Sequence, residues 1–204
     1  MMETINFLLC GVGGQGTILA SDVLVNVGLA AGYQAKQAEV HGMSQRGGSV
    51  TSHVRWGETI HSPLIGVGEV DVLLAFEKLE ALRNLKSLHP QALALINAHT
   101  IKPLAVISGD QIYPSDETLR MAFAQVTSHV ELINGEEIAG SLGNLRVANV
   151  VLLGALSALL KRSILSGQEL TAETWLKVIT ERVPPKHIEL NRKAFQAGRE
   201  AVEK

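Results

Sequence analysis

The stretch "LLCGVGGQGT", residues 8–17, limits the possible folds more than any other part of the sequence. A short apolar run that stops at glycine is typical of a buried strand, and a helical pattern follows from Thr17 onward. Gly11, Gly13 and Gly16 match the spacing G-x-G-x-x-G. A strand, a glycine loop and a helix in this order indicate a Rossmann-like α/β fold.

Further along the chain, apolar runs alternate with helical patterns. The predicted strands are Ile5–Cys10, Tyr33–Gln37, Ser49–Trp56, Val70–Phe76, Ala92–Ile96 and Val130–Ile133. The predicted helices are Thr17–Ala31, one that follows Glu77, one capped by Ser115, Asn144–Lys161, Ala172–Arg182 and a final amphipathic helix after Pro185. Strands that alternate with helices predict a three-layer α/β/α domain with a largely parallel sheet. We expect Ser49 to Ile65 to form a hairpin that adds antiparallel strands.

Composition narrows the class of protein. The chain has 204 residues, of which 46% are hydrophobic, so it can form one domain with a substantial core. Its net charge of −2 gives no reason to expect nucleic acid or an anionic membrane as a partner. The longest apolar stretch, Val147 to Leu160, is shorter than the roughly 20 residues of a membrane span and predicts a buried helix. No secretory signal is visible, so we expect a cytoplasmic protein.

The sequence contains one cysteine, Cys10, at the end of the first apolar run. One cysteine cannot form an internal disulfide or hold an iron–sulfur cluster, which typically needs four thiolates. A cysteine beside a buried strand is most often a small core residue, and we predict that role for Cys10.

A glycine loop at the start of a helix is suited to phosphate, because glycine lets backbone N–H groups approach an anion and the helix N-terminus is partly positive. Gln15 and Thr17 add side chains that can form hydrogen bonds. A dinucleotide fold also needs an acidic residue about 20 positions on, at the end of the second strand. Glu39 has that spacing but lies beyond the expected strand end. Three interpretations stay open: NAD(P) or FAD, another phosphate-bearing ligand, or a turn that only packs helix on strand.

The segment "EVHGMSQRGGSV", residues 39–50, has no hydrophobic periodicity. Its candidate binding residues are Ser44, Gln45, Arg46, Gly47 and Gly48. An arginine ahead of two glycines offers a planar fork of donors on a backbone that a ligand or partner can approach closely. The segment is therefore predicted to be an anion or partner site, with a plain surface loop as the alternative.

Three histidines, His41, His53 and His61, are spread over the predicted loop and strands without the spacing of metal ligands. We interpret His41 as a polar loop residue rather than a catalytic one, because no aspartate lies nearby in sequence to orient it. We therefore predict neither a metal site nor a catalytic residue in this chain.

Two further polar residues follow predicted strands. Glu77 comes after "VDVLLAF" and Asn97 after "ALALI". Since ligands of open α/β sheets lie outside the carboxyl ends of the strands, we expect both residues to share one edge with the glycine loop and the Arg46 segment. For Glu77 the alternative is that it only starts a helix.

These motifs together resemble a known family. "GVGGQG", "HGMSQRGGSV" and "DVLLAFE" are similar to the gamma-type component of 2-oxoacid:ferredoxin oxidoreductases. "GMSQRGG" and the tail "VPPKHIELNRKAFQAG" resemble most the small (beta) subunit of the indolepyruvate type. The resemblance extends over nearly the whole chain, and it implies one gamma-type domain, residues 1–204, that the C-terminal helices of residues 144–204 complete.

The resemblance also implies a function. Members of the family decarboxylate a 2-oxoacid oxidatively, transfer the acyl group to coenzyme A and pass electrons to ferredoxin. Thiamine diphosphate and iron–sulfur clusters are attributed to a larger partner subunit, so this chain is expected to be an accessory subunit that is inactive alone. An isolated chain that forms a homodimer stays open. The alternative function is a free-standing module that binds NAD(P) or FAD.

The family motifs map onto two segments of this chain, whose contact with a ligand or with a subunit stays open. The carried-over residues are Gly11, Gly13, Gly14, Gln15, Gly16, Gly42, Met43, Ser44, Gln45, Arg46, Gly47 and Gly48, to which the loop chemistry adds Thr17.

Overall fold

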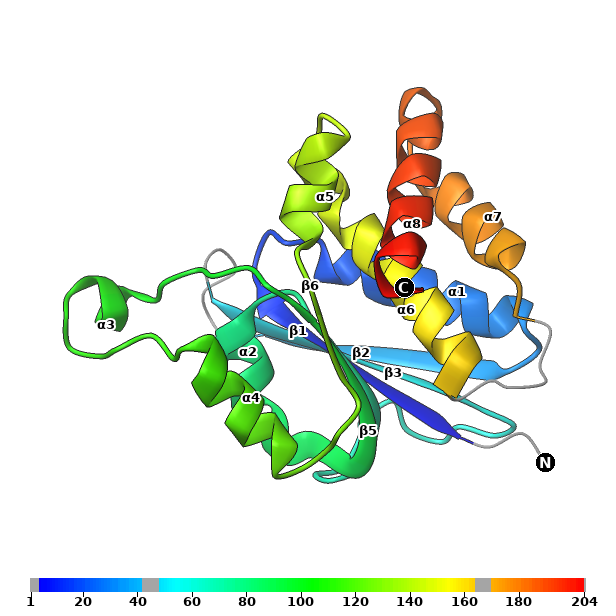
Figure 1. Cartoon of the computed structure of the whole chain (residues 1–204). Coiled ribbons are helices and arrows are strands. Elements are labelled where there is room, and N and C mark those ends of the chain that lie inside the picture. The colour runs from blue at the N-terminus through cyan, green and yellow to red at the C-terminus, as the bar shows by residue number, and fades with distance from the viewer. Residues whose placement is uncertain (1–3, 42–47, 164–169, 204) are drawn as a thin grey trace.

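The computed structural model describes residues 4–41, 48–163 and 170–203. The described residues form one six-stranded sheet with helices on both faces (Figure 1). The strands are β1 (Ile5–Val12), β2 (Gln34–His41), β3 (Ser49–Gly57), β4 (Val70–Ala75), β5 (Leu88–Asn97) and β6 (Val130–Ile133). Their order across the sheet is β2-β3-β1-β4-β5-β6. Only β3 runs antiparallel to its neighbours, so the predicted largely parallel sheet is confirmed.

The two faces of the sheet carry different helices (Figure 1). The helices on one face are α1 (Thr17–Ala30), α5 (Gly135–Ser141), α6 (Ala148–Ser163), α7 (Ala172–Arg182) and α8 (Ile188–Val202). Those on the other face are α2 (Lys78–Arg83) and α4 (Asp116–Ala124). A short helix, α3 (Leu104–Ile107), lies on an arm that projects from the body of the molecule (Figure 1). The 3-10 turns are η1 (Leu85–Ser87), η2 (Leu145–Val147) and η3 (Pro185–His187).

The prediction that Ser49 to Ile65 adds antiparallel structure is confirmed for β3, but the return strand of the predicted hairpin is wrong. β3 pairs with β1 on one side and with β2 on the other, and no strand follows it before β4. Residues 58–69 instead form a loop that side chains of β3 help to hold: Arg55 Nη1 donates to the Ser62 carbonyl at 3.1 Å, and His53 Nδ1 accepts from Ile65 N at 3.2 Å. Side-chain hydrogen bonds are therefore found here in place of the backbone pairing that a second hairpin strand would have made.

Strand β2 is longer than predicted, since it continues to His41 instead of ending at Gln37. Its pairing with β3 carries it this far, from Gln34 opposite Gly57 to His41 opposite Val50. The extension places Glu39 inside the strand, close to the glycine loop. The antiparallel β3 therefore changes both the order of the sheet and the surroundings of the predicted site.

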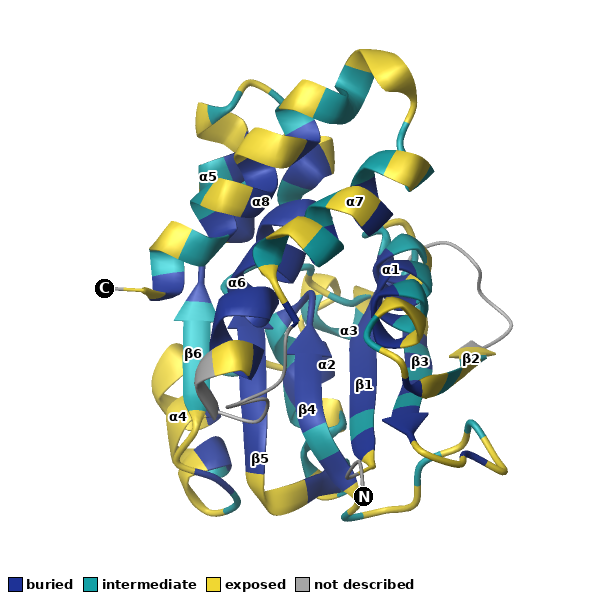
Figure 2. Cartoon of the chain, turned by 90° about the vertical axis from the view of Figure 1, so that its right-hand side faces the viewer, coloured by how far each residue is buried: buried dark blue, intermediate teal, exposed yellow. Residues whose placement is uncertain are grey.

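Helix α6 is buried on almost every side, as predicted for the stretch Val147 to Leu160 (Figure 2). It lies between the sheet and α8, and two glycines let the two backbones touch. A Cβ on Gly154 would lie 2.0 Å from the Phe195 carbonyl oxygen, and one on Gly198 would lie 1.9 Å from the Val151 carbonyl oxygen. Among the described helices, none has both the length and the apolar character needed to cross a membrane.

This close packing gives a stability prediction. We expect Gly154→Ala and Gly198→Ala each to lower the free energy of unfolding by about 1–3 kcal/mol, because the added methyl overpacks a backbone contact. Chemical denaturation of each variant measures the loss. Gly140→Ala in α5 is the matched control, since its nearest neighbour would lie at an ordinary 3.5 Å. Equal midpoints for all three variants would contradict the packing argument.

Candidate functional site

The glycine loop joins β1 to α1 and leaves the start of α1 open. Gly14 and Gly16 have φ values of +106° and +83°, a left-handed backbone that favours glycine. Gly16 is the N-cap of α1, no side chain caps the helix, and its first turn holds no acidic residue. The first N–H groups of a helix have no partner within the helix, so this end of α1 can accept an anion.

Gln15 holds the loop in shape. Its Oε1 accepts from Val12 N at 2.7 Å, and its Nε2 donates to the Phe76 carbonyl at 2.9 Å. Gln15 is predicted to contact a ligand, but both polar atoms of its side chain form hydrogen bonds within the protein. Gly11 has a packing role as well, since a Cβ there would lie 3.0 Å from the Phe76 Cβ.

The end of the second motif lies against the glycine loop. Gly13 N donates to the Gly48 carbonyl at 2.9 Å, and Ser49, the first residue of β3, pairs with Val12 at the end of β1. The Ser49 hydroxyl donates to a buried carboxylate, Glu80 Oε2, at 2.5 Å. Gly48 therefore lies beside the glycine loop, as expected if the two motifs share the carboxyl edge of the sheet. Residues 42–47, which include Ser44, Gln45, Arg46 and Gly47, lie outside the described residues, and their positions stay predictions.

Glu77 and Asn97 both lie at the carboxyl edge of the sheet but are buried, each with 1% of its surface exposed. Glu77 caps α2 by accepting from Glu80 N at 2.9 Å, so the interpretation that it starts a helix is confirmed. It also accepts hydrogen bonds from Ile101 N and from the Tyr113 hydroxyl. Glu77 therefore anchors both ends of the arm that carries α3.

Two groups near this edge, the buried Cys10 and the half-buried Tyr113, have shifted pKa values. Burial raises the pKa of the Cys10 thiol well above its ordinary value, and the nearby carboxylates of Glu80 and Glu77 raise it further. Burial also raises the pKa of Tyr113, together with its hydrogen bond to Glu77. The predicted core role of Cys10 is confirmed, because the residue is fully buried between strands.

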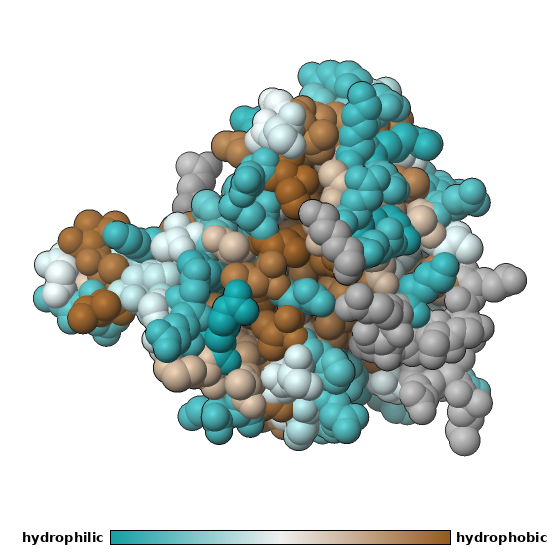
Figure 3. Space-filling view, viewed as in Figure 1, coloured by the Kyte–Doolittle hydropathy of each residue, from teal (hydrophilic) through white to brown (hydrophobic). Residues whose placement is uncertain are grey.

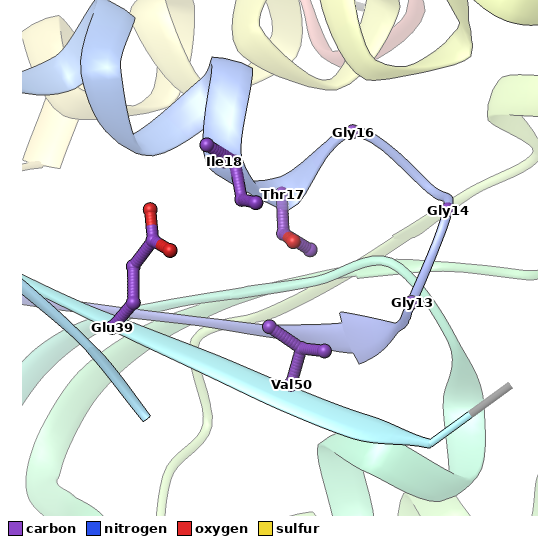
Figure 4. Close-up of a pocket in the computed structure, with 7 residues that line it drawn as sticks. All are labelled: Gly13, Gly14, Gly16, Thr17, Ile18, Glu39 and Val50. Carbon is purple, nitrogen blue, oxygen red and sulfur yellow. The ribbon is translucent and has the colours of Figure 1, made fainter. Parts of the chain in front are cut away.

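Cavities open on both sides of the glycine loop. One of about 460 Å³ lies between the loop, α1 and the strands β2 and β3, with Thr17, Ile18, Glu39 and Val50 in its walls (Figure 4). The other, of about 480 Å³, lies between the loop, the ends of β4 and β5, and the start of α6. Gly14 and Gly16 line both.

The strand order argues against a dinucleotide fold. In that fold the acidic residue that binds the ribose ends a strand next to β1. Here β3 lies between β1 and β2, so Glu39 is displaced by one whole strand. The free-standing NAD(P) or FAD module is therefore not supported by the geometry.

Comparison with known proteins decides the family. The family model for pyruvate ferredoxin/flavodoxin oxidoreductase matches residues 6–201. The chain belongs to this family. Indolepyruvate oxidoreductase subunit IorB from Pyrococcus horikoshii is 39% identical over 202 residues, which cover 98% of this chain and 97% of the relative. The subunit of the same name from Methanothermobacter thermautotrophicus is 33% identical, with 95% of each chain covered.

Solved structures of the family have the same fold. The gamma subunit of a keto/oxoacid ferredoxin oxidoreductase from Geobacter sulfurreducens is 27% identical and has a TM-score of 0.68. The match covers 97% of this chain and 98% of that subunit. A 2-oxoglutarate:ferredoxin oxidoreductase from Magnetococcus marinus gives a TM-score of 0.71 at 19% identity, and 98% of this chain covers 31% of that chain. The fold therefore occurs both as a separate subunit and as part of a longer polypeptide.

Sequence reasoning missed the residues of the second cavity. Asn149 and Arg146 line it beside Gly16, although they lie far from the glycine loop in the sequence. The available signal was a polar Asn149 near the start of the mostly apolar α6. The sequence alone does not show which part of the chain Asn149 contacts, because α6 meets the glycine loop only in the folded protein.

The buried thiol gives a second prediction. At pH 8 we expect Cys10 to resist iodoacetamide in the folded chain, because its raised pKa keeps the thiol protonated and the core shields it. Denaturant should make the thiol react fully. Since the sequence holds one cysteine, mass spectrometry of the intact chain counts the modification directly. Rapid labelling under native conditions would show that Cys10 is not a sealed core residue.

Proposed function

We propose that this chain is the small, accessory subunit of a 2-oxoacid:ferredoxin oxidoreductase of the indolepyruvate type. The complex would oxidise an aryl 2-oxoacid, form the acyl-coenzyme A and reduce ferredoxin. The support is the family match over residues 6–201 and relatives named indolepyruvate oxidoreductase subunit at 33–39% identity along nearly the whole chain.

The chemistry is assigned to a larger partner subunit. Iron–sulfur clusters are typically held by four thiolates, and this sequence has one cysteine, which is buried. We therefore assign thiamine diphosphate and the clusters to the partner, and we expect the chain to be inactive alone.

Coenzyme A is the ligand we assign to the glycine loop. Its phosphates need backbone N–H donors and positive charge, and the uncapped start of α1 offers both. The observation that carries this proposal is the bond from Gly13 N to the Gly48 carbonyl, because it joins the glycine loop to the segment that contains Arg46. Arg46 would supply the guanidinium for a phosphate oxygen.

The proposal is tested by anaerobic purification of the tagged chain from its native cell. We expect a larger subunit to co-purify with iron and thiamine diphosphate, and the eluate to oxidise aryl pyruvates in a reaction that depends on coenzyme A. In that complex, Arg46→Ala should lower kcat/KM for coenzyme A by about 10–100-fold, the value of a hydrogen bond to a charged group. Arg120→Ala, an exposed arginine on α4, is the control. A chain that purifies alone, or with a bound nicotinamide or flavin nucleotide, would overturn the proposal.

The arm that carries α3 is the surface we assign to the larger subunit. Leu104, Ile107 and Ile112 are 80%, 69% and 95% exposed, and the projecting arm shows apolar patches among polar groups (Figure 3). Since it follows β5, it leaves the sheet at the same carboxyl edge as the glycine loop. A partner that acts on a ligand held at that edge must approach from this side, so its surface should cover the apolar arm.

This assignment gives a matched pair of variants. Ile112→Asp should weaken association with the larger subunit by at least about tenfold, because it places a charge in an apolar interface. Val67→Asp is the control, since Val67 is 84% exposed but lies in the loop before β4, at the opposite edge of the sheet. Co-purification yield and size-exclusion chromatography measure the difference. Equal loss in both variants, or none in either, would rule out the arm as a specific contact.

A further inference from the structure

Strand β2 forms an unprotected edge of the sheet (Figure 2). It has eight residues without proline or glycine, and its register with β3 runs from Gln34 to His41 without a bulge. Its one lysine, Lys36, donates to the His61 carbonyl at 3.3 Å and so does not stand free at the edge. Natural edge strands are usually short, or are guarded by proline, bulges or charges, because an open edge pairs readily with another strand. The opposite edge strand, β6, meets this rule with four residues, whereas β2 does not.

The hydrogen-bond pattern shows which groups of β2 face outward. Because Gly13 N donates to the Gly48 carbonyl, the even-numbered residues of β3 bond to β1 and the odd-numbered ones bond to β2. The register pairs those odd-numbered residues with even-numbered residues of β2. The backbone N–H and C=O groups of Ala35, Gln37 and Glu39 therefore point away from the sheet, and no strand of the described chain lies beside them.

Helix α1 adds an apolar surface next to this edge. Ile18 and Glu39 lie in the walls of the same cavity, so the Ile18 side of α1 faces β2 (Figure 4). Val25 and Leu29 follow Ile18 at seven and eleven positions, which places the three side chains on one side of the helix. Ile18 is 58% and Leu29 51% exposed, and Val25 is half-buried. An open strand and an exposed apolar helix face thus form one continuous surface.

We propose that two copies of this chain associate through this surface, with their β2 strands paired antiparallel about a two-fold axis at Gln37. In this register Gln37 faces its own counterpart, and Ala35 of each copy faces Glu39 of the other. All the outward backbone groups of the three residues are then paired. The same axis brings Ile18 of one copy near Leu29 of the other, because α1 begins beside the end of β2 and ends just before its start.

The distribution of charge favours a second copy as the occupant. Each Glu39 faces the uncharged Ala35, whereas an axis at Ala38 would bring the two Glu39 carboxylates to diagonal positions, where they repel each other. The one acidic residue on the same side of α1, Asp22, is already paired with Arg182 at 2.5 Å. The edge is therefore complementary to itself.

This contact leaves the arm free. Strand β2 lies at one edge of the sheet, and β5, from which the arm leaves, is separated from it by three strands. A second copy and the larger subunit can therefore bind at the same time, and the inference does not depend on the proposed function.

The first test is the mass of the isolated full-length chain by analytical ultracentrifugation, which should be that of a dimer. Gln37→Lys should raise the dimer Kd by at least about tenfold, because it places two like charges opposite each other on the axis. Gln125→Lys, at an exposed glutamine after α4, is its control. Leu29→Asp should raise Kd by at least about tenfold as well, whereas Met121→Asp, at a residue of α4 that is 58% exposed, should leave it unchanged.

Disulfide cross-linking tests the register. Gln37→Cys should give a covalent dimer on oxidation by copper phenanthroline, because the Cα atoms of such a pair lie about 5.5 Å apart, within the range of a disulfide. Val40→Cys should not, because its two copies would lie about 20 Å apart along the strands. The native Cys10 is buried and does not compete.

A monomeric wild-type chain, an unchanged Kd for Gln37→Lys, or cross-linking through Val40→Cys instead of Gln37→Cys would overturn the inference. Protection of the β2 amides from hydrogen exchange only after the larger subunit is added would assign the edge to that subunit instead. Thermal unfolding identifies any variant that fails to fold, and Leu29→Asp with the cross-linking decides if Gln37→Lys is lost in this way. Co-purification of the larger subunit tests the proposed function separately.

Discussion

The insertion of the antiparallel strand β3 between β1 and β2 is the constraint on which the rest of the structure depends. Its ladder with β1 runs from Trp56 opposite Ile5 to Ser49 opposite Val12, so β3 begins where β1 ends. The residue before β3, Gly48, is thereby held against Gly13. In a purely parallel sheet this loop would enter a helix or lie at the opposite edge, and the two glycine-containing motifs would not meet.

Buried polar side chains hold the loops at the carboxyl edge of the sheet in place. Glu80 ties the start of β3 to α2 through Ser49 and Arg83, and Glu77 ties the base of the arm to the N-terminus of α2. Asn97 joins β5 to α5 through Gly135 N. A buried carboxylate or amide is favourable only when its hydrogen bonds are satisfied, so these residues specify one arrangement of the surrounding loops. Their role is to hold the candidate site in place: Asn97 also lines the cavity toward α6, but its side-chain amide is hydrogen-bonded to Phe76, Glu136 and Gly135.

Local patterns predicted most elements, and their limits have physical causes. The apolar run at Val70, the Ser115 cap and the buried helix after Val147 are each encoded in neighbouring residues, and each is observed. The hairpin after Ser49 failed because strand pairing is non-local: the segment alternates, but alternation does not say which strand lies beside it. The end of β2 was misplaced for the same reason, since its last residues are held by β3.

The sequence by itself determined the fold class, the glycine loop at the start of α1 and the family. These features depend on the order and spacing of residues within short segments, which can be read without knowing the tertiary structure. Only the tertiary structure decided the strand order, the contact between Gly13 and Gly48, and the position of Asn149 beside Gly16. The reason is distance along the chain: the loop and Asn149 are brought together by the packing of α6 on the sheet. That packing depends on the summed burial of many apolar side chains, to which no single motif points.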